Sequence, residues 1–361
     1  MQMSSRVWVV LFCLSLSLPA VAQQSVPATA LQQEPNAALS VSPGGQIRLD
    51  AVVTDRSGKV IPGLQKQDFS VFDNKKPSNI LSFQAVNETL AAADPVDVIL
   101  VVDQVNTTFD RVAYERDEIK RFLTRNEGKL AQPVSLVFFS DNGTQIQGKP
   151  SFDGNALMAA FDQNQNALRT IRRSTGIYGA EERLQLSLKT LSGLTATEAS
   201  KPGRKMIIWI SPGWPILSGP RITLSANDEK GIFNSVVQIS TALRQASITL
   251  YSVDPLGTAD AGGLRATYYQ DFLKAATSPN RVDIGDLALQ VIATQSGGLV
   301  TYGSNSIVAG IDHSIADLSA YYVLSVAAAP ADKPNEYHAI EVKVATPGLT
   351  ARTRYGYYAQ P

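Results

Sequence analysis

The middle of the chain alternates short apolar runs with helix-compatible stretches, and this rhythm constrains the fold more than any other feature. Residues 96–102 form a nearly continuous apolar run, VDVILVV, as in a strand buried on both faces of a parallel sheet. A helix-compatible stretch follows at 110–125, and the alternation then continues. We expect further strands at 134–139, 206–210, 247–253 and 299–302, and further helices at 155–166, 178–191, 232–246, 284–295 and 306–318. This pattern predicts an α/β fold with a doubly wound, mostly parallel sheet.

Ligands of doubly wound sheets bind outside the carboxyl ends of the strands. The turns that follow Val102, Phe139, Ile210 and Val253 are therefore the places where a functional site is expected.

The two ends of the chain have the shorter rhythm of β-strands. Residues 47–54, 69–72 and 80–86 are strand candidates near the amino end, and residues 321–327, 337–344 and 350–358 near the carboxyl end. Three short strands cannot close a core alone, because one face and both edges of such a sheet stay uncovered. We therefore predict one β-sandwich built from residues 46–90 and 319–361, with the doubly wound domain inserted between them at 94–318.

The amino terminus has the features of a secretory signal peptide. Arg6 precedes an apolar run at 7–19 that is too short for a stable membrane span, and Ala20 and Ala22 form an A-x-A cleavage pattern. We expect cleavage before Gln23, which removes residues 1–22 and leaves a disordered leader at 23–45; an uncleaved anchor is the alternative. The predicted location is secreted or periplasmic, with no membrane span in the mature chain.

Composition excludes several classes of function. Lys and Arg total 32 and Asp and Glu total 32, so the chain lacks the positive field on which non-specific nucleic-acid binding depends. The only cysteine, Cys13, lies in the predicted signal peptide, and only His313 and His338 are histidines, so one chain cannot assemble a histidine-cysteine zinc cluster. Both histidines are expected to be exposed.

The turn that follows Val102 carries side chains with oxygen atoms. Asp103, Asn106 and Thr107 lie in the loop DQVNT, which follows the first strand of the doubly wound region. This loop resembles that of the von Willebrand factor A (VWFA) family, whose D-x-S-x-S motif holds a divalent cation. The form D-x-x-N-T is similar to a bacterial group of VWFA-related proteins often found in acidobacteria. Blocks VVTDRSG and GLQKQDF near the amino end and IEVKV and RYGY near the carboxyl end extend the resemblance over nearly the whole mature chain.

The resemblance implies a cation site in which some residues differ from the family motif. Asp103 and Thr107 match family ligands, and Thr175 is similar to the distant threonine, so Mg²⁺ or another divalent cation is the implied cofactor. Val105 stands where the first serine is expected, although Asn106 offers a carboxamide oxygen, and Pro212 replaces the aspartate after the 206–210 strand. Because Mg²⁺ prefers six oxygens in near-octahedral geometry, we expect weak binding or none.

The same residues have a simpler interpretation. Asp, Asn and Thr commonly cap the helix that follows a strand-to-helix turn, and Asp103 can order its own loop through hydrogen bonds. Asp254, before Pro255, is similarly expected to be a turn carboxylate.

Two long irregular stretches, 212–230 and 255–283, are predicted to flank the same edge of the sheet. Trp214, Tyr268 and Tyr269 lie in them and are of the aromatic types that anchor interfaces. Arg172 and Arg173 precede Thr175; a solvated loop is the simpler interpretation, but a basic rim here could select an acidic partner. We therefore expect a surface for a protein partner along this edge.

No short catalytic motif is present, and neither histidine is predicted near this edge. We infer an exported, non-catalytic protein-binding or adhesion-type module with a degenerate cation site. The alternatives are a hydrolase or accessory enzyme subunit that acts on cell-envelope polymer, and a purely structural component of the envelope.

Overall fold

The computed structural model describes residues 45–87, 89–90, 95–107, 109–141, 143–163, 176–217, 223–256 and 265–361. The predicted signal peptide and all but the last residue of the predicted leader lie outside these ranges. Among the helices within these ranges, none combines the length and apolarity needed to cross a membrane.

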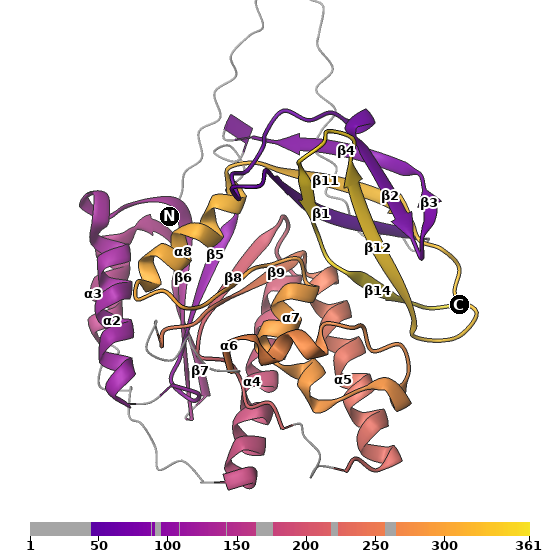
Figure 1. Cartoon of the computed structure of the whole chain (residues 1–361). Coiled ribbons are helices and arrows are strands. Elements are labelled where there is room, and N and C mark those ends of the chain that lie inside the picture. Colours follow the sequence, from indigo (N-terminus) through magenta and orange to yellow (C-terminus); the bar gives the residue numbers. More distant parts are fainter. Residues whose placement is uncertain are drawn as a thin grey trace, which may run out of the picture. The chain divides into compact units, whose positions relative to one another are not determined.

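A six-stranded sheet forms the centre of the α/β region (Figure 1). Its strands are β5 (Asp97–Asp103), β6 (Lys129–Ser140), β7 (Gly143–Asp153), β8 (Lys205–Ile210), β9 (Ile248–Val253) and β10 (Val300–Thr301). The order is β10-β9-β8-β5-β6-β7, and every pair is parallel except β6 with β7. This confirms the predicted mostly parallel, doubly wound sheet and is consistent with a VWFA-like arrangement. The antiparallel edge strand β7 was not predicted.

Helices cover both faces of this sheet, because its strands are apolar on both sides. In β5, Val98, Leu100 and Val102 face one core, and Ile99 and Val101 face the other. The first core is closed by α2 (Phe109–Thr124), α3 (Gly154–Gln163) and α8 (Ile307–Ile315). The second core is closed by α4 (Gly176–Ala199), α5 (Ala226–Gln245) and α7 (Leu289–Gln295).

The helix expected at 284–295 is interrupted. The chain forms a short 3-10 turn, η7 (Ile284–Leu287), then an extended residue, Ala288, and then α7. Asp283 and Asp286 form a reciprocal capping box around η7, which favours a separate turn over one continuous helix. The other short helical elements are η1 (Lys66–Asp68), η2 (Arg125–Gly128), α6 (Arg265–Tyr268), η5 (Tyr269–Phe272), η6 (Pro279–Arg281) and η8 (Ala316–Leu318).

Both ends of the chain contribute strands to each sheet of the β-sandwich. The strands are β1 (Gln46–Thr54), β2 (Phe69–Asp73), β3 (Lys76–Ser78), β4 (Ile80–Val86), β11 (Tyr321–Ala327), β12 (Glu336–Val344), β13 (Thr350–Arg352) and β14 (Gly356–Ala359). One sheet has the order β13-β1-β11-β4, and the other β14-β12-β2-β3. Strands β1 and β11 are antiparallel, as are β2 and β12, so the predicted pairing of the two ends is confirmed. The domain boundaries stay predictions.

The expectation that His338 is exposed is wrong. Its ring is buried, and Nδ1 lies 2.8 Å from Oδ1 of Asp73. The hydroxyl of Tyr357 donates to Oδ2 of the same carboxylate at 2.6 Å. His338 is in phase with Ile340 and Val342 along β12, and that face of the strand points into the sandwich core. The other histidine, His313, is exposed as expected.

Candidate functional site

The predicted loop lies where the strand order of the central sheet reverses. Strands β5 and β8 are neighbours, although β6 and β7 lie between them in sequence, and the helices that follow β5 and β8 pack on opposite faces. Asp103 is the last residue of β5, and Ser211 follows directly after β8. This is the position at which doubly wound sheets bind their ligands. The Asp103 loop therefore occupies the expected place for a functional site.

The carboxylate of Asp103 is enclosed by hydrogen-bond donors of the protein itself. Oδ1 accepts from the backbone N–H groups of Val105 at 3.0 Å and Asn106 at 2.9 Å. Oδ2 accepts from the side-chain amide of Asn106 at 2.8 Å and from the indole N–H of Trp209 at 2.9 Å. A carboxylate offers about four acceptor positions, so these four donors fill it.

Trp209 provides the donor that connects the two strands. It belongs to β8, is fully buried, and its ring packs edge-on against Phe139 and Trp214 with ring centroids 5.8 and 5.1 Å apart. Asn106 extends the network to α4, because its side-chain amide also donates to the hydroxyl of Ser187 at 3.0 Å. The network thus joins β5, β8 and α4 through hydrogen bonds.

Burial and hydrogen bonding act in opposite directions on Asp103. Burial of the carboxyl, which has no exposed surface, raises its pKa above the ordinary value. Hydrogen bonds from Trp209 and Asn106 lower this pKa again, because they favour the charged form. The group is therefore ordered and shielded from solvent, which suits a structural carboxylate better than a proton donor or a ligand for solvent-borne ions.

The residues around Asp103 do not fit a magnesium site. Besides the filled carboxylate, Val105 is buried in the core and has no oxygen in its side chain, and Pro212 cannot supply one. Thr107 is fully buried, and neither its hydroxyl nor the carbonyl oxygen of the Asn106 side chain has a partner among the described residues. Two neutral oxygens are a poor replacement for the carboxylate oxygens that Mg²⁺ prefers. No cluster of three or more His, Cys, Asp or Glu side chains within the described ranges could hold a metal ion.

The turn after β8 is fixed by its own contacts. Gly213 has a φ of +105°, and a Cβ at this position would come within 2.3 Å of the side-chain amide of Gln290. That amide donates to the carbonyl of Pro212 at 3.4 Å. Pro212 therefore lies in a turn that packs against α7. Asp254, after β9, is a turn carboxylate as expected, and accepts the N–H of Leu256 at 2.9 Å.

The predicted partner-binding residues differ in how far their side chains are exposed. Trp214 and Tyr269 are buried with 3% and 7% of their surface exposed, whereas the prediction implied accessible side chains. Trp214 covers Trp209, and Tyr269 packs with Ala288 and Val291. Tyr268 is half-exposed and stacks edge-on with Phe272 at 5.3 Å. Arg172, Arg173 and Thr175 lie outside the described residues.

An exposed apolar pair, which lies in the first turn of α4 and beyond the edge where Asp103 lies, was not predicted from the sequence. Tyr178 and Ile177, in the first turn of α4, are 81% and 54% exposed. Ser187, further along α4, contacts the Asp103 loop, and α4 runs on toward the start of β8. Its first turn therefore points past the edge where Asp103 lies. The sequence did contain a signal for this pair, because two large apolar residues stand together at 177–178. The helical pattern placed Tyr178 in a helix but did not indicate that its side chain is exposed.

No protein-family model and no curated protein matches the chain. Among solved structures, the chain is similar to an aerotolerance-related membrane protein from Bacteroides fragilis, at 13% sequence identity and a TM-score of 0.34. That alignment covers 62% of this chain and 98% of the other. A likeness this distant carries no conclusion about activity or partners.

Proposed function

We propose that the chain is an exported, non-catalytic protein-binding module of the VWFA-related bacterial type, and that it binds its partner without a divalent cation at Asp103. The observation that carries this proposal is the filled carboxylate of Asp103. An aspartate that accepts four protein donors can neither offer a free oxygen to a cation nor exchange a proton with a substrate. The proposed secreted or periplasmic location rests on the A-x-A pattern that ends at Ala22.

The exposed pair Ile177 and Tyr178 supports a protein partner. Tyrosine is among the residues that most often dominate binding energy at protein interfaces, because it combines a large apolar ring with a polar tip. The half-exposed ring of Tyr268 is a further candidate contact from the predicted set. We propose that these side chains contact the partner at the carboxyl edge of the sheet, and that the adjacent cluster around Asp103 keeps this edge rigid.

Capture from a cell-envelope extract tests the proposal. The immobilised full chain is compared with a double variant, Ile177→Ala with Tyr178→Ala, and partners are identified by mass spectrometry. Loss of a central tyrosine typically costs 2 kcal/mol or more, so we expect capture of the specific partner to weaken about thirtyfold or more. A chelator should leave capture unchanged.

Leu81→Ala is the matched control, because Leu81 is 48% exposed but belongs to the sandwich strand β4. Equal capture by wild type and the double variant, or loss of capture on chelation, would contradict the proposal. The hydrolase alternative predicts turnover of envelope polymer that Asp103→Ala removes. Turnover assays on the same preparations therefore separate the two classes.

A further inference from the structure

Arg354 is held against helix α7 by the backbone around it. It lies in the short connection between β13 and β14, and the N–H of the next residue, Tyr355, donates to the carbonyl of Gln295 at 3.0 Å. Gly297 permits this close approach, because a Cβ there would lie 2.8 Å from the carbonyl carbon of Thr353. A residue of the carboxyl-terminal sandwich segment is therefore fixed on a helix of the α/β region.

The guanidinium of Arg354 has no acceptor within the described part of the chain. The residue is 8% exposed, and its side chain makes no hydrogen bond or ion pair there. Burial lowers the pKa of Arg354 to about 10, and the positive charge of Arg244 lowers it as well. The negative charge of Asp50 raises this pKa, but its carboxylate accepts a hydrogen bond from Arg48 at 3.2 Å. Because buried charges are normally paired, Arg354 calls for a negatively charged ligand.

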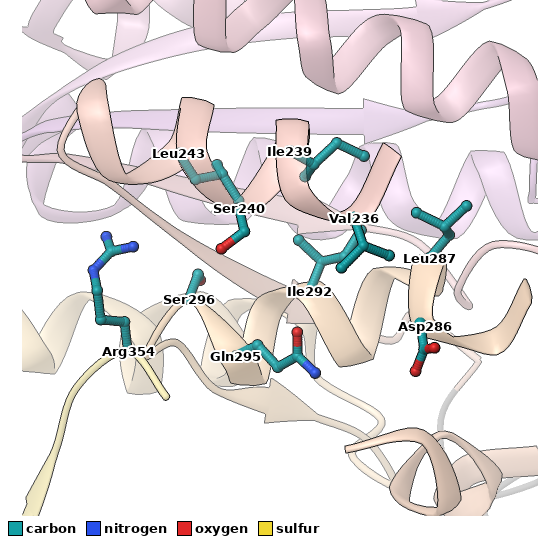
Figure 2. Close-up of a pocket in the computed structure, with 10 residues that line it drawn as sticks. All are labelled: Val236, Ile239, Ser240, Leu243, Asp286, Leu287, Ile292, Gln295, Ser296 and Arg354. Carbon is teal, nitrogen blue, oxygen red and sulfur yellow. The ribbon is translucent and has the colours of Figure 1, made fainter. Parts of the chain in front are cut away.

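Arg354 lines a small pocket between α5 and α7 (Figure 2). It lies at one end, beside Ser240 and Ser296, and Asp286 lies at the other end. The wall between the two ends is mostly apolar, and its apolar part is formed by Val236, Ile239, Leu243, Leu287 and Ile292. These side chains offer no polar partner to the positive charge at one end.

Two neutral donors in the pocket can join the guanidinium. The hydroxyl of Ser240 and the side-chain amide of Gln295 line the pocket, and neither makes a hydrogen bond with a described residue. The hydroxyl of Ser296 is already engaged, because it donates to the carbonyl of Ala293 at 2.8 Å and accepts the N–H of Leu250 at 2.9 Å. Three side chains that line the pocket can therefore each donate a hydrogen bond to an anion.

Asp286 does not serve as the counter-ion of Arg354. Its Oδ2 accepts the backbone N–H of Asp283 at 2.8 Å, and Figure 2 shows its carboxyl at the far end of the pocket. Burial raises the pKa of Asp286 to about 6, whereas a guanidinium in contact with it would lower this pKa. The end of the pocket at Arg354 is therefore open to an external anion.

The size of the pocket limits which anion can bind. Its free space is about 20 Å³, whereas one water molecule needs roughly 10–15 Å³. A monatomic anion such as chloride, which is only slightly larger than water, is compatible with this space, whereas phosphate, sulfate and organic carboxylates are too large. A water molecule also fits, but it leaves the charge of the guanidinium unpaired. Size and charge together therefore favour a halide.

We propose that this pocket binds a single halide ion, chloride in ordinary salt solutions, on the guanidinium of Arg354, with Ser240 and Gln295 as further donors. Hydrogen bonds from the charged guanidinium are the strongest of these contacts. Arg354 belongs to the sandwich segment, whereas Ser240 and Gln295 belong to α5 and α7. The ion therefore bridges the sandwich and the α/β region and stabilises their contact. This site does not depend on the proposed partner surface.

The line width of the chloride NMR signal, measured in solutions of the full chain, tests this proposal. Chloride that exchanges with a protein site gives a broadened signal, so we expect an excess line width in the wild type that saturates as chloride is added. Bromide should displace chloride and remove the excess, whereas sulfate at equal ionic strength should not, because it is too large for the pocket.

Two variants locate the bound ion. Arg354→Met keeps an unbranched side chain of similar volume, and should weaken chloride binding at least tenfold because the charged donor is lost. Arg56→Met is the matched control, since Arg56 is exposed on the sandwich, and should bind chloride as the wild type does. Ser240→Ala removes one donor without a change of charge and should weaken binding about tenfold. It tests the same site if Arg354→Met does not fold.

Thermal unfolding gives a second measurement. As chloride replaces sulfate at constant ionic strength, the wild type and Arg56→Met should gain Tm relative to Arg354→Met. The proposal would be overturned by a wild type without saturable excess line width, by unchanged chloride binding in Arg354→Met or Ser240→Ala, or by displacement of chloride by sulfate. A pocket that holds only water predicts no saturable excess line width and no chloride-dependent difference in Tm.

Discussion

Asp103 and Arg354 are both buried charged side chains, but their surroundings are opposite. Asp103 lies where a doubly wound sheet is expected to bind a ligand, and four N–H donors of the protein fill its carboxylate. Arg354 lies in a connection of the sandwich, and no acceptor among the described residues contacts its guanidinium. The position at which the fold predicts a ligand is thus filled by donors of the protein itself. The guanidinium of Arg354, at a position where the fold predicts no ligand, has no acceptor among the described residues.

This difference shows that the location of a site and its ability to bind a ligand have separate causes. The fold determines where strands end and where loops lie. In this chain it places Asp103 where the strand order of the central sheet reverses. Whether that position binds anything depends on the partners of each polar atom, because a filled carboxylate has nothing left to offer a ligand. Function therefore has to be argued from individual hydrogen bonds.

The largest expected effect comes from breaking the closed site. Asp103→Ala removes the common acceptor of Val105, Asn106 and Trp209, and leaves their N–H groups buried without partners. Each such group costs about 1–3 kcal/mol, so we expect the free energy of unfolding to fall by about 3 kcal/mol in urea titrations.

Asp332→Ala provides the comparison, because Asp332 is exposed and its loss should change stability by less than about 0.5 kcal/mol. If the Asp103 site were an open, vestigial cation site, the carboxylate would be poorly compensated, and its removal would leave stability unchanged or raise it. A neutral or stabilising Asp103→Ala would therefore contradict the closed arrangement.

A smaller effect of opposite sign is expected at the open pocket. Burial raises the pKa of Asp286 from 3.8 to about 6, so the folded state holds this proton more tightly than the unfolded state does. The stabilisation from protonated Asp286 is fully present below about pH 4 and is lost as the pH rises through about 6. Asp286→Asn avoids the buried charge and keeps a carbonyl oxygen for the N–H of Asp283.

We expect this variant to be about 1 kcal/mol more stable than the wild type at pH 7.5, because partial solvation reduces the effect of the shift. The difference should vanish near pH 4, as measured by urea unfolding across this range. If Asp286 were instead the counter-ion of Arg354, the variant would be less stable at pH 7.5. That result would remove the open end of the pocket from the comparison.

The layered fold could be predicted from sequence because its signals are local. Apolar runs such as 96–102 identify buried parallel strands without knowledge of their neighbours. Strand β7 was missed because its sequence, GTQIQGKPSFD, is polar and interrupted by Gly and Pro, as is typical of an edge strand. For His338 the alternation with Ile340 and Val342 did contain the answer, but the polarity of histidine was given more weight than its phase.

The sites were harder to predict because they depend on contacts between distant residues. The resemblance to the VWFA family predicted that Val105 and Pro212 stand where two oxygen ligands would be expected. The hydrogen bond from the indole of Trp209 to Asp103 could not be predicted, since the two residues are 106 positions apart and meet only through the pairing of β5 with β8. The unpaired state of Arg354 likewise depends on where Asp50 and Asp286 lie after folding.

The smallest expected effect is the response of the wild type to divalent cations. Titration with Mg²⁺, Mn²⁺ and Ca²⁺ should leave its Tm unchanged, because the indole N–H of Trp209 already occupies Oδ2 of Asp103. A variant that combines Val105→Ser and Pro212→Asp restores two oxygen ligands but keeps this indole, so it should still respond weakly. Adding Trp209→Phe frees Oδ2 while retaining an aromatic ring against Phe139 and Trp214, and only this triple variant should show a Tm that rises with Mg²⁺ concentration. A clear rise in the wild type, abolished by Asp103→Ala, would instead mean that the network opens readily, and the contrast between the closed carboxylate and the open guanidinium would not hold.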